Sequence, residues 1–185
     1  MASPTSDRTV ALSLQLSRTH RDLLRRIDDL RSDPGSRRPD EDPLSTHCLA
    51  FCEALTAHHE GEDEGLFAQL LRERPDLAPT IAKLVEDHGL ISGILSRVRA
   101  LALRAAGSAA AEREAVRREL DGLAAIMESH FRYEERAISA ALDATTPLGD
   151  WPDPVFRPGP AAARRDHPRQ HTAQGRTAQG RTAPT

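Results

Sequence analysis

Four segments of this 185-residue chain carry apolar residues at helical spacing, and each segment has a histidine in the same register. Residues at alternating steps of four and three share one face of an α-helix. Polar side chains on such a core-facing stripe are costly to bury unless they are paired or bind a metal. The last segment shows the pattern over seven positions: Val116, Leu120, Leu123, Met127, His130, Glu134 and Ala137.

The spacing predicts four long helices, over about residues 7–30, 43–72, 79–107 and 109–144. Asp42 and Pro43 suit the N-cap and the first position of the second helix. The connections are short, which favours antiparallel neighbours. The predicted fold class is therefore all-α: an antiparallel up-down-up-down four-helix bundle, followed by a disordered C-terminal tail.

The composition changes after Pro147, which divides the chain into a helical domain, 1–146, and a tail, 147–185. The tail is rich in proline, glycine and arginine and repeats Thr-Ala-Gln-Gly-Arg at 172–176 and 177–181. Such a sequence cannot bury a core, so we expect disorder. Whether Trp151 and Phe156 fold back onto the bundle is left open by the sequence.

Charge and hydropathy exclude several classes of function. The net charge of −3 gives no reason to expect a nucleic-acid or membrane partner. No apolar run approaches the roughly 18 residues that cross a bilayer, and the N-terminus lacks a signal pattern, so we expect a cytoplasmic protein. Cys48 and Cys52, four residues apart on one predicted helix, are interpreted as buried thiols rather than a disulfide.

Six polar residues lie in register with the apolar stripes, and two of the histidines are followed four residues later by a glutamate. Residues four apart are neighbours on one helix face, so each His-x-x-x-Glu pair presents a ring nitrogen and a carboxylate to one cavity. Four imidazoles and two carboxylates suit two iron ions, with the glutamates bridging them. A metal-free bundle with hydrogen-bonded histidines is the simpler alternative. The six candidate metal ligands are His20, His58, Glu62, His88, His130 and Glu134.

Other metal-site motifs do not fit. A ferritin-type site needs Glu-x-x-His, and no histidine here has a glutamate three residues before it. A zincin needs His-Glu-x-x-His, but His59-Glu60 is followed by Asp63 at the second histidine position. No separate nucleophile or general base is evident, so the metals would supply the chemistry.

The ordered set of His20, His58/Glu62, His88 and His130/Glu134 resembles the hemerythrin-like, or HHE cation-binding, domain family. The resemblance covers roughly residues 10–145 and is most marked at 58–67 and 130–135. It implies a non-heme di-iron centre with an oxo or hydroxo bridge as cofactor.

The second helix contains a rival pair, because His59 and Asp63 also stand four residues apart. The pair His58/Glu62 is favoured, since Leu66-Phe67 follow it at the spacing that the family shows and the fourth helix repeats its phase. On this interpretation His59 lies behind the ligands or at the rim, and Asp63 and Glu135 accept hydrogen bonds from histidine N–H groups.

One position departs from the pattern of oxygen-carrying hemerythrins, which have a second histidine four residues after the one on the third helix. Here that position is Ser92, and the position four residues before His88 is Leu84. One iron is therefore expected to lack an imidazole and to have an open position, which suits reaction more than reversible carriage.

The resulting hypothesis is a non-heme di-iron protein that binds or reacts with oxygen, peroxide or nitric oxide. Peroxidase-like, catalase-like and oxidase activities are all compatible with it. The alternative is a non-catalytic iron or oxygen sensor, or a metal-binding module. Besides the small ligand, a redox or regulatory protein is the expected partner.

Overall fold

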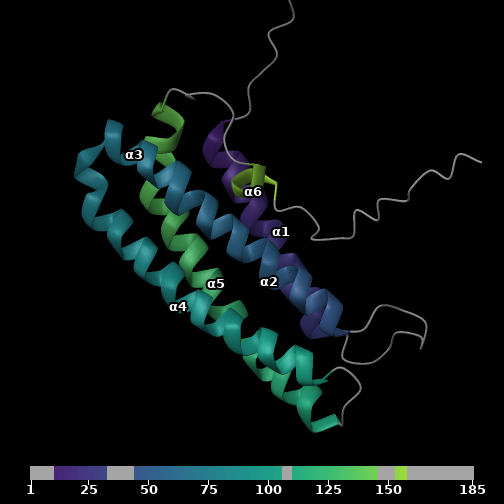
Figure 1. The fold of residues 1–185 in the computed structure, drawn as a ribbon. Helices are drawn as coiled ribbons and strands as arrows, with labels where there is room; N and C mark the ends of the chain where they lie inside the picture. Colours follow the sequence, from purple (N-terminus) through teal and green to yellow (C-terminus); the bar gives the residue numbers. More distant parts are fainter. Residues whose placement is uncertain (1–10, 33–43, 106–109, 146–152, 158–185) are drawn as a thin grey trace, which may run out of the picture.

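A computed structural model of the protein describes residues 11–32, 44–105, 110–145 and 153–157. Every described element is helical, and four long rods run side by side (Figure 1). The elements are α1 (Leu12–Ser32), α2 (Leu44–Gly61), the π-helix η1 (Glu62–Leu66), α3 (Phe67–Glu73), the 3-10 helix η2 (Pro75–Leu77), α4 (Ala78–Ala105), α5 (Ala110–Ala144) and α6 (Asp153–Phe156).

The rods form a closed antiparallel bundle, which confirms the predicted fold class. Helix α1 packs against α2 and α5, and α4 packs against the same two helices on the other side. Successive rods run in opposite directions (Figure 1). Two predicted features lie outside the described residues: residues 7–10 of the first predicted helix and the predicted N-cap Asp42.

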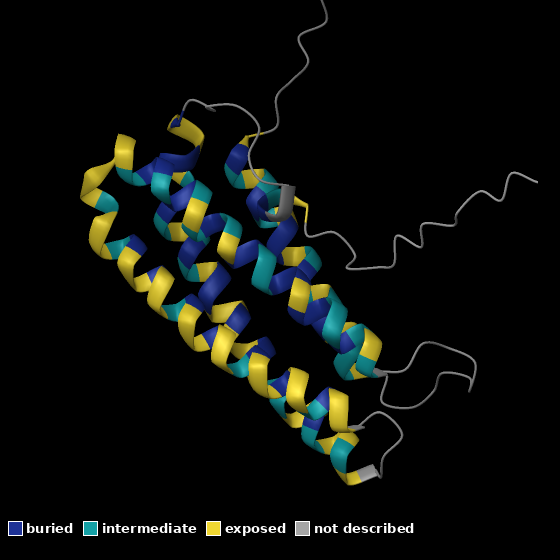
Figure 2. Ribbon diagram, viewed as in Figure 1, coloured by how far each residue is buried: buried dark blue, intermediate teal, exposed yellow. Residues whose placement is uncertain are grey.

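Two apolar clusters fill the bundle, one on each side of the level at which the in-register histidines lie. The first includes Leu23, Leu55 and Leu120, and the second includes Leu16, Leu66 and Ile138. Buried residues line the inner faces of all four rods and exposed residues lie outside (Figure 2). The polar residues are therefore held between two aliphatic layers that exclude water on both sides.

The second rod is interrupted by the π-helix η1, where the N–H of Phe67 donates to the carbonyl of Glu62, five residues earlier. The wider turn shifts the phase of the buried face by about one residue. Before it, both His58 and His59 are buried, and after it, both Leu66 and Phe67 are buried. π-Bulges of this kind are frequent at functional sites.

The two cysteines agree with the sequence interpretation. Cys48 and Cys52 are free and buried in the first cluster. Burial raises the pKa of the Cys48 thiol to about 12 and that of Cys52 to about 11. Both thiols therefore stay protonated and behave as small apolar side chains.

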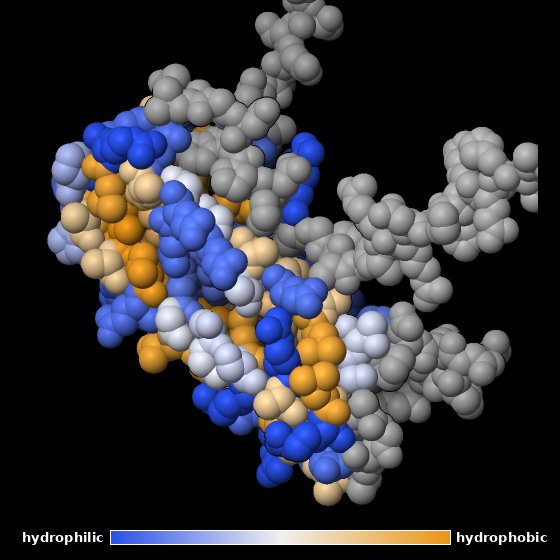
Figure 3. Space-filling model, in the orientation of Figure 1, coloured by the Kyte–Doolittle hydropathy of each residue, from blue (hydrophilic) through white to orange (hydrophobic). Residues whose placement is uncertain are grey.

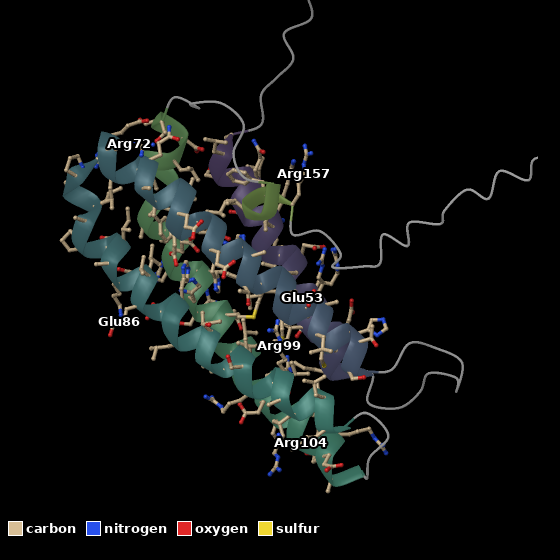
Figure 4. The ribbon with its side chains drawn as sticks, viewed as in Figure 1. Glu53, Arg72, Glu86, Arg99, Arg104 and Arg157 are labelled. Atoms are coloured by element: carbon tan, nitrogen blue, oxygen red, sulfur yellow. The ribbon has the colours of Figure 1, made fainter. Side chains whose placement is uncertain are left out.

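The outer surface mixes hydrophilic and apolar side chains (Figure 3). Charged residues such as Glu53, Glu86 and Arg104 lie on the outside of the bundle (Figure 4). Within the described ranges, no helix combines the length and the apolar character that crossing a bilayer requires.

Part of the expected tail is ordered. Helix α6 lies within residues 147–185, which were predicted to be disordered, yet it packs against α1 and α2 (Figure 1). Val155 is fully buried in the second cluster, and Phe156 packs against the same cluster. Phe156 therefore folds back onto the bundle, whereas Trp151 lies outside the described residues.

Candidate metal centre

Seven polar side chains meet at one level of the bundle, and none is more than 5% exposed. All six residues predicted from the sequence are among them. They come from four rods: α1 contributes one, α2 and η1 together three, α4 one and α5 two. The seven residues are His20, His58, His59, Glu62, His88, His130 and Glu134.

Three histidines form one group, in which ligand atoms of His59, His88 and His130 lie within 4.8 Å of one another. The Nε2 atoms of His88 and His130 are 3.0 Å apart. The ring of His59 completes the group from α2, which packs against α4. Three imidazoles from three helices can therefore bind one ion.

A second group lies beside it and consists of His20, His58 and Glu62. The Nε2 atom of His58 lies 3.1 Å from Glu62 Oε1, and the Nε2 atom of His20 lies 3.7 Å from the same oxygen. Two imidazoles and one carboxylate oxygen therefore face a common point.

The two glutamates face both groups. Glu62 directs Oε1 toward His20 and His58, while its Oε2 lies 3.7 Å from Nε2 of His88. The Oε2 atom of Glu134 lies 3.5 Å from Nε2 of His20 and 3.7 Å from Nε2 of His130. Each carboxylate is thus placed so that two ions, one in each group, could share it.

Hydrogen bonds donated by the outer ring nitrogens orient three of the histidines. Nδ1 of His88 donates to Asp63 at 2.8 Å, and Nδ1 of His20 donates to Glu135 at 2.9 Å. These two contacts agree with the acceptor roles predicted for the acidic residues that follow each buried glutamate. When Nδ1 carries the proton, the lone pair of Nε2 faces the cavity, as metal binding requires.

The third such bond comes from outside the bundle helices. Nδ1 of His58 donates to the main-chain carbonyl of Val155, in α6, at 3.1 Å. Nothing in the spacing of the sequence pointed to this contact, because the acceptor is a backbone atom whose residue type is irrelevant to it.

The outer edge of His130 lies beside a surface cavity between α4 and α5, with a volume of about 520 Å³. Asp87 also lines this cavity, and its Oδ2 atom lies 3.8 Å from Nδ1 of His130, beyond hydrogen-bonding distance. This is the side of the site at which a histidine of the three-histidine group approaches the surface.

In the metal-free protein, burial shifts the pKa values of the site residues. Desolvation, reinforced by nearby acidic groups, raises the pKa of Glu62 well above its usual range and that of Glu134 to about 8. Desolvation lowers the pKa of His59 well below its usual range and that of His130 to about 3. These two imidazoles are therefore neutral at pH 7, which is the form that binds metals.

Several buried atoms of the site lack hydrogen bonds within the part of the chain that is described. They are both carboxylate oxygens of Glu62 and of Glu134, and Nε2 of His20 and of His59. Buried polar atoms without partners are rare in native proteins, and here they converge on one cavity. Nitrogen and oxygen atoms without sulfur suit ions such as iron, zinc or manganese, so the residues fit the expected cofactor.

His59 is the buried histidine of the site that was not among the six predicted ligands. The structure places it in the three-histidine group, whereas Ser92 is exposed and Leu84 is buried among apolar residues. The imidazole expected to be missing at position 92 is thus matched by one from α2. The adjacent pair His58-His59 was the available signal, but the spacing of the apolar residues did not show that the buried face is wide enough to include both rings.

Residues 14–142, more than half of the chain, match the family described as Hemerythrin HHE cation binding domain. The match includes all seven buried residues of the site and ends before α6. Comparisons with curated proteins and with solved structures gave no match.

Proposed function

Because the chain belongs to the hemerythrin HHE cation-binding domain family, we propose that its seven buried residues hold two iron ions as a non-heme di-iron centre. The observation that carries the proposal is the pair of histidine groups with two buried glutamates between them. With a single ion, one of the two histidine groups would bind no metal, and its buried polar atoms would be left without partners, which costs free energy.

The proposed assignment follows the two groups. His59, His88 and His130 bind one ion, His20 and His58 bind the other, and both glutamates are shared. The first ion then has three imidazoles and two carboxylates, and the second has two imidazoles and two carboxylates. Because the second ion has fewer protein ligands, the position for an external ligand is at the half formed by His20 and His58.

We infer that this position receives a small ligand: oxygen, peroxide or nitric oxide. The iron pair would supply the electrons for a reaction with any of them. The chain's own residues orient the ligand nitrogens and exclude water. Phe131, for example, stacks on the ring of His20 with centroids 3.9 Å apart and planes 3° apart. Since His59 supplies the third imidazole, reversible oxygen binding is no longer disfavoured by Ser92.

A sensor role is the second candidate, and the contact between α6 and His58 favours it. Ligand binding at the His20–His58 half would alter the hydrogen bond between His58 and Val155, and so would change the position of α6. A redox or regulatory protein partner and a cytoplasmic location stay predictions in either case.

Rapid mixing of the iron-loaded, reduced protein with oxygen, hydrogen peroxide or nitric oxide tests the proposal. We expect a change in near-ultraviolet absorption with at least one of these ligands. Repeated peroxide consumption would favour an enzyme, and one stoichiometric change followed by altered protease sensitivity of the tail would favour a sensor. No spectral change with any of the three would contradict the proposed function.

A further inference from the structure

Helix α6 lies outside the matched domain yet contacts the candidate metal centre. It packs in contact with α1 and α2, the two helices that carry His20 and His58 (Figure 1). The exposed Arg157 follows it at the outer side of the bundle (Figure 4). Of the described residues, 153–157 are the ones that follow the bundle helices in sequence.

Two backbone carbonyls and one side chain attach α6 to the bundle. The carbonyl of Val155 accepts from His58, and that of Phe156 accepts from the hydroxyl of Thr19 at 3.0 Å. Thr19 is buried and precedes His20. The Val155 side chain is fully buried among apolar residues of the second cluster. The attachment therefore combines apolar burial with hydrogen bonds next to both histidines of one half.

The acceptor for His58 differs in kind from those of the other two oriented rings. His20 and His88 donate to carboxylates carried on bundle helices, so their acceptors stay in place whenever the bundle is folded. The acceptor of His58 is a carbonyl on a separate segment. If α6 leaves the bundle, His58 alone loses its acceptor, and the proton is no longer held on Nδ1.

We propose that α6 is a strap that positions His58 for metal binding and closes the His20–His58 half against solvent. This inference rests on the proposed function, because that half is the one assigned the position for a small ligand. Release of the strap exposes this half, while the three-histidine half keeps all its contacts. Helix α6 thereby controls one half of the centre.

Two truncated chains and one point variant test the strap. Removing residues 158–185 keeps α6, whereas removing residues 146–185 deletes it. Val155→Asp places a carboxylate in an apolar site and should expel α6, and Val85→Asp, at a valine that is 41% exposed on α4, is the matched control. Helical content measured by circular dichroism shows which variants stay folded.

The first measurement is iron removal by a chelator from the loaded proteins. Without α6, or with Val155→Asp, one of the two irons should leave about tenfold faster or more, the size of effect expected when a ligand histidine loses its acceptor. The intact chain, the chain lacking 158–185 and Val85→Asp should release both irons slowly. Equal rates of iron release from all five proteins would overturn the proposal that α6 acts as a strap.

The second measurement needs no metal. Carbethoxylation of histidines in the metal-free protein, located by mass spectrometry, should modify His58 in the chain without α6 and in Val155→Asp but not in the controls. His88 should stay protected throughout. Protection of His58 in every variant would overturn the strap, whereas exposure of His58 in a protein that binds no iron would contradict the di-iron proposal and leave the strap standing.

Discussion

The ring of His59 stacks on the ring of His88, with centroids 4.0 Å apart and planes within 6° of parallel. The two residues come from α2 and α4, and both are buried. Because His130 completes the same group, the stack brings an imidazole from α2 to the place where Ser92 offers none. His59 therefore lies within the candidate metal centre, beside His88 and His130.

His59→Ala should lower the iron content toward one per chain, because the three-histidine group loses one of its nitrogen ligands. His47→Ala is the matched control, since His47 lies on the same helix but three turns away. Iron analysis of both purified variants makes the comparison. An unchanged iron content and affinity in His59→Ala would show that the ring is not a ligand.

Glu62→Gln and Glu134→Gln should each reduce iron binding at both halves, because each carboxylate faces both histidine groups. Glu64→Gln, an exposed neighbour in η1, should leave two irons in place. Titration of the metal-free variants with ferrous iron measures the affinities. If Glu62→Gln or Glu134→Gln loses one iron but binds the other with unchanged affinity, that glutamate does not bind both ions.

The acidic residues that accept hydrogen bonds from the histidines should increase the affinity for iron. Asp63→Ala and Glu135→Ala remove the acceptors of His88 and His20, and we expect each to weaken iron binding by about 10–100-fold. Glu128→Ala serves as control, because Glu128 lies on the exposed side of α5 and forms an ion pair with Arg132. Equal affinities in the three variants would argue against an orienting role.

The metal-free protein should have a stability maximum between about pH 4.5 and 6.5, the ordinary pKa values of the two residue types. The pKa of folded Glu134 is raised to about 8, so stability is lost as the pH rises from 6.5 to 8. The pKa of folded His130 is lowered to about 3, so stability is lost as the pH falls below 4.5, where the raised pKa values of the buried carboxyl groups no longer offset this loss.

Thermal melting of the metal-free protein across this range checks the pH dependence. Glu134→Gln should flatten the loss between pH 6.5 and 8, because an amide does not titrate, whereas Glu64→Gln should retain it. A melting temperature that stays constant from pH 6.5 to 8 in the unmodified protein would be inconsistent with the raised carboxyl pKa values.

The four helices and the position of the site along the bundle could be predicted from the spacing of the apolar residues. Burying one face of a helix requires apolar residues at alternating steps of three and four, and the sequence has them. His20, His88 and Glu134 each lie on a regular helix, where that period also decides which polar residues face inward. Their placement needed no tertiary information.

Two features could not be predicted in this way. The π-helix adds one residue to a turn, and its five-residue hydrogen bond from Phe67 to Glu62 has no signature in composition. Both His58 and His59 are buried just before this change of phase, whereas the spacing alone had to choose between the two phases. Helix α6 is only four residues long and lies in proline-rich sequence, so its position depends on the tertiary packing and hydrogen bonds of Val155 and Phe156.

The central claim is that five histidines and two glutamates form one dinuclear centre. Metal analysis of protein purified from iron-replete cells, combined with Mössbauer spectroscopy, tests it most directly. We predict close to two irons per chain, in two environments that differ because one ion has three imidazoles and the other two. One zinc ion per chain and no iron, or a single isolated iron, would contradict the account.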